Sequence, residues 1–339
     1  MVKPLQSWAR SLQRIAQRNV ASLTRNNVRS GRRAVVQALT PALDKHKPPP
    51  GAGDWLMGVA LGLAGARRYR LYRPPGMKFG ERLPLMVMLH GCGQDAKSFA
   101  LSTRMNRIAA RERFLVLYPE QDRMANAQGC WNWFDTKSGR AHGEAALIMK
   151  AIDQVCLLYA ADRTRVAAAG LSAGASMAAL LVARHPERFK AVMMHSGIPP
   201  GTAHSTLSAI GAMHGLRGTT ALPAAPQAMV ASWPPLLVIH GSDDRVVSVN
   251  NGRAAAQVWA EVGGARPGDP RSVHRGKRHA TTVTDYQHRR RSAATLVEVN
   301  HLGHAWSGGA PKQPFSDSEG PDASRMIWAF AAKQFRPGA

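Results

Sequence analysis

The sequence predicts an α/β fold in which a mostly parallel sheet carries helices on both faces. Segments of strand length alternate with segments of helix length along residues 67–335, and parallel strands need such helical crossovers. Residues 85–89 are apolar at every position, which is typical of a strand buried on both faces. With 339 residues, of which 45% are hydrophobic, the chain can bury a core of this kind.

The individual elements are predicted from hydrophobic periodicity. Residues 68–72 alternate like a half-exposed edge strand, and the apolar segment 55–66 is expected to be structured rather than an export signal. Further strands are predicted at residues 114–118, 165–169, 191–195, 236–239 and 296–299, and helices at residues 105–112, 144–159, 176–185 and 323–335.

The composition divides the chain into a basic N-terminal extension with a linker, residues 1–50, and an α/β domain, residues 51–339. Leu5, Trp8, Leu12 and Ile15 share one face of a helix whose other face carries arginines, so this segment is predicted to bind a surface. A solvated helix and an organelle transit peptide are the alternatives. Within the domain, residues 199–235 predict a cap insertion and residues 268–292 a basic insertion.

The charge and the cysteine count exclude several classes of protein. The net charge of +24 favours a polyanion or an anionic surface as a partner, without indicating a specific nucleic acid. Three cysteines exclude a disulfide scaffold, and no metal-ligand spacing is present, so neither a metal nor a cofactor is expected. The longest apolar run, about a dozen residues, is too short to span a membrane.

The motif Gly170-Leu171-Ser172-Ala173-Gly174 lies between a predicted strand and a predicted helix. A serine nucleophile must stand clear of the backbone on a sharp strand-to-helix turn, and small neighbours permit that turn. Ser172 is therefore the candidate nucleophile, and a plain glycine-rich turn is the alternative.

A serine hydroxyl needs a base, and the base needs an acid that orients it, in the chain order serine, acid, histidine. Asp244 follows the strand at 236–239 and His304 follows the strand at 296–299, and these two are the predicted acid and base. Asp243 and His301 are the nearby alternatives. His90, His195 and His240 sit at strand ends and are predicted to be structural imidazoles.

Backbone N–H groups must also stabilise the oxyanion that forms when an ester is attacked. One donor is predicted at Ala173, the residue after the nucleophile. The other is predicted at Cys92, in the loop after the strand at 85–89, with Gly91 or Gly93 as alternatives.

Several segments together resemble the polyhydroxybutyrate (PHB) depolymerase family of serine esterases. They are Leu89-His90-Gly91-Cys92, Cys130-Trp131-Asn132-Trp133-Phe134, the Ser172 motif, Gly303-His304-Ala305-Trp306 and Gly320-Pro321-Asp322-Ala323-Ser324-Arg325. The resemblance covers residues 55–335 and implies an α/β-hydrolase fold with Ser172, Asp244 and His304 as the triad. Ser307 departs from it, because the family often has proline after this tryptophan.

The resemblance implies a carboxylic ester hydrolase acting on poly(3-hydroxybutyrate), related short-chain polyhydroxyalkanoates or their oligomers through an acyl-enzyme. A feruloyl or acetylxylan esterase is the first alternative, and a non-catalytic basic protein that binds granules or nucleic acid is the second. The favoured location is cytoplasmic, on storage granules through the basic N-terminus, and secretion is the alternative.

The same segments suggest two further features of the site. Cys92 and Cys130 would both border it, which suggests a disulfide that braces the oxyanion loop, against two reduced thiols as the alternative. Aromatic side chains near the site are predicted to form an apolar wall for acyl chains, and ordinary core packing is the alternative. These residues are Tyr118, Trp131, Trp133 and Trp306.

Overall fold

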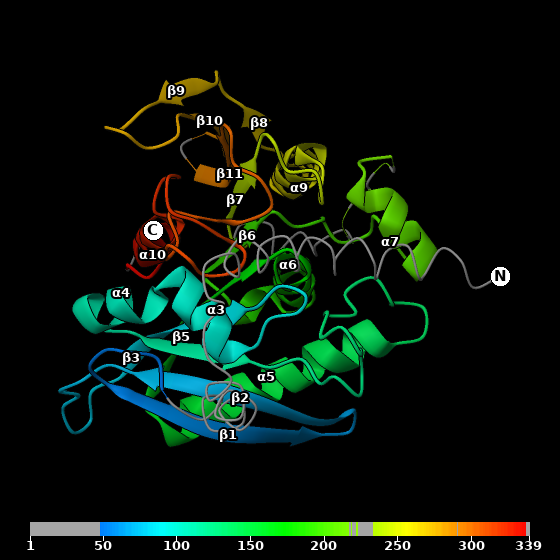
Figure 1. Ribbon diagram of the computed structural model, residues 1–339. Coiled ribbons are helices and arrows are strands. Elements are labelled where there is room, and N and C mark those ends of the chain that lie inside the picture. The colour runs from blue at the N-terminus through cyan, green and yellow to red at the C-terminus, as the bar shows by residue number, and fades with distance from the viewer. Residues whose placement is uncertain (1–47, 217, 219–221, 223–232, 290, 337–339) are drawn as a thin grey trace, which may run out of the picture. The chain divides into compact units, whose positions relative to one another are not determined.

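A central sheet runs through the part of the chain that this computed structural model describes, which comprises residues 48–216, 218, 222, 233–289 and 291–336 (Figure 1). The chain divides into two units, Met1–Pro48 and Pro49–Ala339, and only the second contains elements described below. The predicted surface-binding helix within residues 1–50 lies outside the described residues.

The described residues form an 11-stranded sheet with the order β1-β2-β4-β3-β5-β6-β7-β11-β10-β8, and β9 pairs with β10. The six strands from β4 to β11 are parallel, whereas β1, β2, β10, β9 and β8 are added antiparallel at the two ends. The bounds are β1 (Asp54–Gly62), β2 (Gly65–Arg73), β3 (Leu83–Leu89), β4 (Leu115–Pro119), β5 (Ala161–Leu171), β6 (Ala191–His195), β7 (Leu236–Gly241), β8 (Arg266–Pro267), β9 (Arg271–Val273), β10 (Thr281–His288) and β11 (Arg291–Val299).

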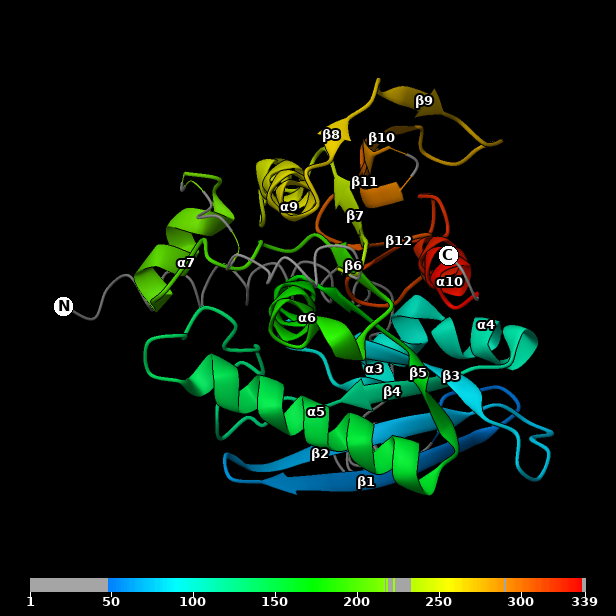
Figure 2. The same cartoon turned by 180° about the vertical axis from the view of Figure 1, so that it is seen from behind.

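Helices cover both faces of the sheet (Figures 1 and 2). One face carries α5 (Arg140–Leu158), α6 (Ala173–Arg184) and α9 (Val249–Val262), and the other carries α3 (Ala96–Thr103), α4 (Met105–Glu112) and α10 (Ala323–Gln334). The helix α7 (Thr206–Met213), a 3-10 turn at Pro186–Arg188 and a short parallel pair, β12 (Trp306–Ser307) and β13 (Ser316–Asp317), complete the described elements.

The strand β3 shows why the sequence requires two helical layers. All of its residues are buried, and successive side chains point to opposite faces. Leu85, Val87 and Leu89 pack with α5 and α6, while Met86 and Met88 pack with α3, α4 and α10. The predicted α/β-hydrolase fold, a mostly parallel sheet with helices on both faces, is confirmed.

One prediction about the ends of the sheet needs correction. The strand predicted at residues 68–72 is β2, which lies between β1 and β4 rather than at the edge, because residues 54–62 form β1 and pair with it in a hairpin. The region predicted as a basic insertion, residues 268–292, contains β9, β10 and the start of β11, and so forms part of the sheet. That it is an insertion stays a prediction.

The parallel core determines where the site lies. The strands β3, β5, β7 and β11 run in one direction, so the loops after them leave from the same edge of the sheet. Those loops carry Cys92, Ser172, Asp244 and His304, respectively. None of the helices in the described part of the chain combines the length and the apolarity of a membrane span.

Candidate active site

Ser172 occupies a strained turn between β5 and α6. Its backbone has φ 56° and ψ −122°, a conformation that is costly for any residue with a Cβ atom. A Cβ on Gly170 would lie 2.4 Å from the backbone of Gly174, and one on Gly174 would lie 2.1 Å from the carbonyl oxygen of Leu89. Both glycines of the motif are therefore needed for the close contact between α6 and the strands, and the turn leaves Ser172 only half-buried.

Asp244 and His304 form a hydrogen-bonded pair. The Nδ1 of His304 lies 2.8 Å from Oδ2 of Asp244, and because a carboxylate only accepts, Nδ1–H is the donor. The other oxygen of Asp244 accepts the backbone N–H groups of Val246 and Val247, both at 2.9 Å. The carboxylate is thereby fixed, and the Nε2 of His304 is left for another partner.

Burial and hydrogen bonding act in opposite directions on Asp244, whose side chain is fully buried. Burial raises the pKa of its carboxyl, but the charge of His304 and hydrogen bonds from His240 and His304 outweigh it and hold the pKa well below its ordinary value. Asp244 is therefore ionised wherever the protein is folded near neutral pH.

His240 is a supporting residue whose contact with the acid was not anticipated. Its Nε2 lies 2.9 Å from the carbonyl oxygen of Val247 and 3.5 Å from Oδ2 of Asp244. The signal in the sequence is its position, four residues before Asp244 at the end of β7. His240 therefore helps to hold Asp244 in place. This is the structural role that the sequence predicted for it.

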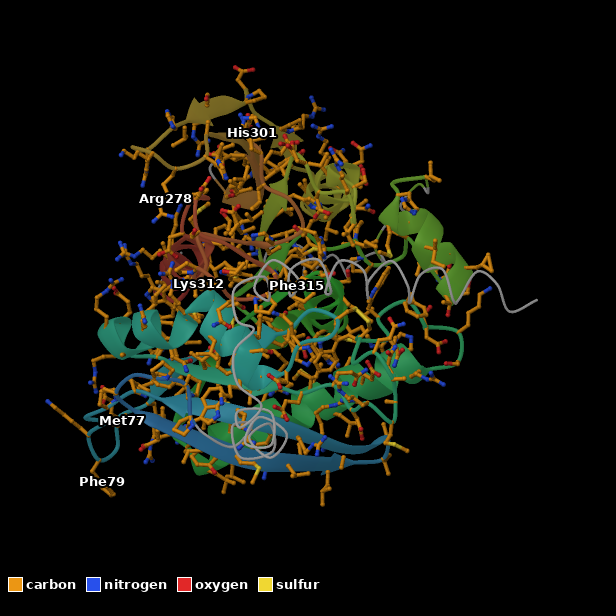
Figure 3. The ribbon with its side chains drawn as sticks, in the orientation of Figure 1. Met77, Phe79, Arg278, His301, Lys312 and Phe315 are labelled. Carbon is orange, nitrogen blue, oxygen red and sulfur yellow. A yellow bond between two sulfur atoms is a disulfide. The ribbon has the colours of Figure 1, made fainter. Side chains whose placement is uncertain are left out.

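The alternatives Asp243 and His301 lie on the surface, and Figure 3 labels His301. Their side chains are 57% and 79% exposed, with 3.9 Å between His301 Nδ1 and Asp243 Oδ2. Asp243 also accepts the hydroxyl of Ser242 at 2.7 Å, and the ring of His301 lies beside that of His279. The structure thus brings together the pair that the sequence favoured and separates it from the alternatives.

The loop after β3 has one unpaired N–H group among its residues 91–94. Gly91 donates its N–H to the side-chain oxygen of Gln94 at 2.9 Å, and Gly93 donates its N–H to the carbonyl oxygen of Gln128 at 3.0 Å. Gln94 N–H donates to Gly91 O at 3.2 Å. Within the described part of the chain, the N–H of Cys92 has no partner. This distribution favours Cys92 over Gly91 and Gly93 as an oxyanion donor.

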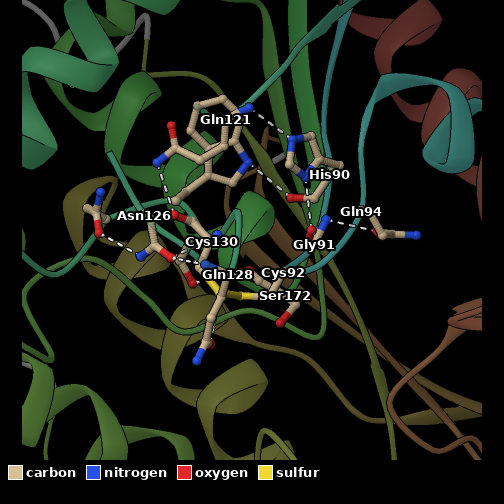
Figure 4. The surroundings of a disulfide bond; sticks show 12 residues. His90, Gly91, Cys92, Gln94, Gln121, Asn126, Gln128, Cys130 and Ser172 are labelled. Carbon is tan, nitrogen blue, oxygen red and sulfur yellow. Dashed lines mark hydrogen bonds between the residues drawn. A yellow bond between two sulfur atoms is a disulfide. The ribbon is translucent and has the colours of Figure 1, made fainter. Parts of the chain in front are cut away.

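A disulfide joins Cys92 to Cys130, as predicted, with Cα atoms 4.2 Å apart. It ties the loop after β3 to the segment 130–134, and Figure 4 shows Ser172 beside it. Cys156 is a buried free thiol in α5.

A buried polar cluster, formed by Gln121, Asn132 and Glu144, holds the segment 130–134. One oxygen of Glu144 accepts the side-chain amides of Gln121 and Asn132, both at 2.6 Å, and the other accepts the N–H of Asn132 at 2.9 Å. The indole N–H of Trp131 donates to the carbonyl oxygen of His90 at 3.0 Å. These contacts fix the segment against β3, and no sequence pattern pointed to Glu144 or Gln121.

Three of the four aromatic residues predicted to line a substrate wall belong to the core instead. Tyr118, Trp131 and Trp306 are 0% exposed, so a substrate cannot reach their rings in this structure. Tyr118 donates its hydroxyl to Asn106, and Trp306 donates its N–H to Ser324. Trp133, 7% exposed, packs at the edge of Phe134 and is the member of the set with remaining accessible surface.

His195 connects the two halves of the site. Its carbonyl oxygen accepts the backbone N–H of Ser172 at 2.9 Å, and its Nε2 accepts the N–H of Ser307 at 3.1 Å. Burial, followed by the charges of His240 and His304, lowers the pKa of His195 to about 3, so the ring is neutral and can accept.

The Ser172 hydroxyl makes no hydrogen bond to His304 in the described structure. Hydrogen bonds between catalytic groups are often long or misaligned without substrate. Within the described ranges, no group of three or more His, Cys, Asp or Glu residues is placed to hold a metal ion.

The chain is similar to known proteins over parts of its length. The chain is 32% identical over 187 residues to poly(3-hydroxyalkanoate) depolymerase C of Paucimonas lemoignei, which covers 52% of this chain and 44% of that protein. It is 32% identical over 131 residues to feruloyl esterase B of Neurospora crassa, covering 38% and 44%. The alignments thus span less than half of these two relatives.

Among solved structures, the acetyl xylan esterase from Aspergillus awamori superposes with a TM-score of 0.61 at 18% identity, over 84% of this chain and 100% of that one. That likeness concerns the fold. The family model described as Esterase PHB depolymerase matches residues 67–265, a range that includes Ser172 and Asp244 and ends before His304. Because this match spans more than half of the sequence, the chain belongs to the PHB depolymerase esterase family.

Proposed function

We propose that the protein hydrolyses carboxylic esters with Ser172 as nucleophile, His304 as base and Asp244 as the acid that orients it. The observation that carries this proposal is the hydrogen bond of 2.8 Å between His304 and a fully buried Asp244, on loops that leave the same sheet edge as the strained turn of Ser172. The family match supports the reaction class.

The first half of the reaction forms an acyl-enzyme. The Oγ of Ser172 attacks the ester carbonyl carbon while its proton passes to Nε2 of His304. Asp244 stabilises the resulting imidazolium, and the N–H groups of Cys92 and Ala173 donate to the oxyanion. The intermediate then collapses, and the leaving alcohol takes the proton from His304.

The second half hydrolyses the acyl-enzyme. His304 removes a proton from a water molecule that attacks the acyl carbon, and the proton returns to Ser172 Oγ as the acid leaves. Comparing Ser172→Ala with the wild-type chain on a soluble p-nitrophenyl ester tests the scheme. Equal rates would contradict it, as would failure of the wild-type chain to react with a serine-directed phosphonate, which is the result expected of a non-catalytic basic protein.

For the substrate, we propose short-chain polyhydroxyalkanoates such as poly(3-hydroxybutyrate), or their oligomers. The named activity of the Paucimonas lemoignei relative supports this choice. A feruloyl or acetylxylan ester is the second candidate, because feruloyl esterase B is an equally identical relative over a shorter segment. Release of hydroxybutyrate from amorphous polymer and oligomers, measured beside release from feruloylated and acetylated xylan, distinguishes the two.

Granule adsorption through residues 1–50 stays a prediction. Deleting these residues should weaken adsorption to polymer granules and leave turnover of a soluble ester unchanged.

For the location, the Cys92–Cys130 disulfide supports secretion over the cytoplasm, because disulfides persist in oxidising compartments.

A further inference from the structure

A groove of about 820 Å³ lies on the α4 and α10 face of the sheet and contains no residue of the proposed triad. Seven arginines line it: three at or within α4, three from β9 and the loop after it, and one from α10. We call it the arginine groove. Figure 3 labels one of its members, Arg278, in the loop between β9 and β10.

The positive charge in the arginine groove is only partly neutralised. Arg111, Arg271 and Arg325 pair with Glu112, Asp285 and Asp322, respectively. Asp322 is the one carboxylate in the lining, and it also caps α10 through the N–H of Arg325.

The remaining four arginines have no acidic partner among the described residues. Arg104 donates to the carbonyl oxygens of Gly308 and Gly309, and Arg278 donates to those of Ser318 and Gly320. Arg107 and Arg275 have neither an ion pair nor a side-chain hydrogen bond in the described structure, and both are exposed. The groove therefore carries four guanidinium groups without an acidic partner among the described residues, two at α4 and two in the loop after β9.

The type of cation in the arginine groove and the apolar side chains beside the cations indicate which ligand it would bind. The cationic lining contains arginine but no lysine, and guanidinium groups match phosphate oxygens in a two-pronged geometry. Apolar side chains, among them Val273, Met326 and Phe330, also line the groove, and apolar surroundings lower the local dielectric and strengthen ionic contacts.

We propose that the arginine groove binds a single chain of phosphate groups. A linear ligand fits because the unpaired cations extend from α4 to the loop after β9, and a single chain fits because the volume is that of a small-ligand cleft rather than of a duplex-sized surface. Inorganic polyphosphate and single-stranded nucleic acid both present this chemistry.

The test measures binding of fluorescently labelled polyphosphate and, separately, of an oligothymidylate to the full chain over a range of salt concentrations. The double variant Arg107→Ala/Arg275→Ala is compared with Arg82→Ala/Arg184→Ala, which removes the same charge from exposed arginines outside the groove. Thermal unfolding of each variant checks that it is folded.

The groove variant should bind at least tenfold more weakly, and the slope of log K against log salt should fall by about 1.4, at about 0.7 for each lost phosphate contact. The control variant should keep most of the affinity. Tighter binding of polyphosphate or of the oligothymidylate identifies the source of the phosphates. Equal losses in both variants, or no binding of either chain, would overturn the proposal.

Discussion

The Nε2 atom of His195 accepts the backbone N–H of Ser307, which directly follows Trp306 and lies three residues after His304. His195 is fully buried at the end of β6 and uses its carbonyl oxygen to hold the N–H of Ser172. His195 therefore links the backbone of the proposed nucleophile to the segment that follows the proposed base.

Replacing Ser307 with proline removes that amide hydrogen and leaves a buried acceptor unpaired. We expect Ser307→Pro to lower the free energy of unfolding by about 1–3 kcal/mol and to reduce esterase turnover. Ser307→Ala keeps the N–H and loses only the hydrogen bond from the hydroxyl to Pro321, so its turnover should stay close to that of the wild-type chain. If the two variants have the same turnover, the amide has no positioning role.

Neighbouring acids provide a matched pair for the proposed mechanism. Asp244→Asn replaces the acceptor of His304 Nδ1–H with an amide and should lower kcat about 10³–10⁴-fold. Asp243→Asn changes an exposed side chain 57% accessible to solvent and should leave kcat unchanged. Steady-state kinetics on a soluble ester decide the assignment, and a larger loss in the Asp243 variant would reverse it.

Buried histidines predict how stability changes with pH. Burial lowers the pKa of His90 to about 4 and that of His195 to about 3, whereas both titrate near 6.5 in the unfolded chain. Below pH 6.5 the unfolded state therefore binds more protons, and the free energy of unfolding should fall as the pH drops from 6.5 towards 4.

Asp244 extends this decline to lower pH. Its folded pKa lies below the ordinary value of 3.8, so its stabilising contribution is complete above that value and is lost as the pH falls further.

Thermal unfolding midpoints from pH 7.5 to 4 measure the contribution of the histidines, and His90→Gln should give a shallower decline than the wild-type chain. Midpoints that do not change between pH 6.5 and 4 would show that these imidazoles do not stay neutral in the folded protein.

Loss of the disulfide should affect stability and turnover together. The bridge closes a loop with a sequence separation of 38 residues, and the chain-entropy model gives about 4 kcal/mol for a loop of that size. Cys92→Ser/Cys130→Ser should lower the unfolding midpoint, and it should lower kcat because the loop that carries the Cys92 N–H loses its tie. Cys156→Ala serves as the control, because it removes the free cysteine and leaves the bridge intact. An unchanged kcat in the double variant would show that the bridge is not needed for catalysis.

Elements with a strong hydrophobic period were predictable from the sequence. Elements whose burial depends on their contacts in the folded protein were not. The predictions for α4 and β6 match their observed bounds, because an amphipathic helix and a fully buried strand each leave a clear signal. The helix α9 was missed because residues 249–262 contain asparagine, glycine and few large apolar residues, and most of its buried positions are small or polar, with Trp259 as the large exception.

In the site, residues positioned by strand ends were predictable and residues positioned by tertiary contacts were not. Asp244 and His304 follow apolar strands, so topology alone places them together. Nothing in the sequence shows that Trp306 packs against His195 and Phe99 rather than facing a ligand. The role of Glu144 likewise depends on a segment that only folding brings to it.

The position of β11 in the strand order has a consequence for synthesis of the chain on the ribosome. This strand pairs with β7 and leads to His304, yet it is translated after all the other strands of the main sheet. A nascent chain that has emerged only to residue 290 already contains Ser172 and Asp244, but it lacks the imidazole. Premature termination between residues 172 and 304 should therefore release a polypeptide that carries the nucleophile and cannot activate it.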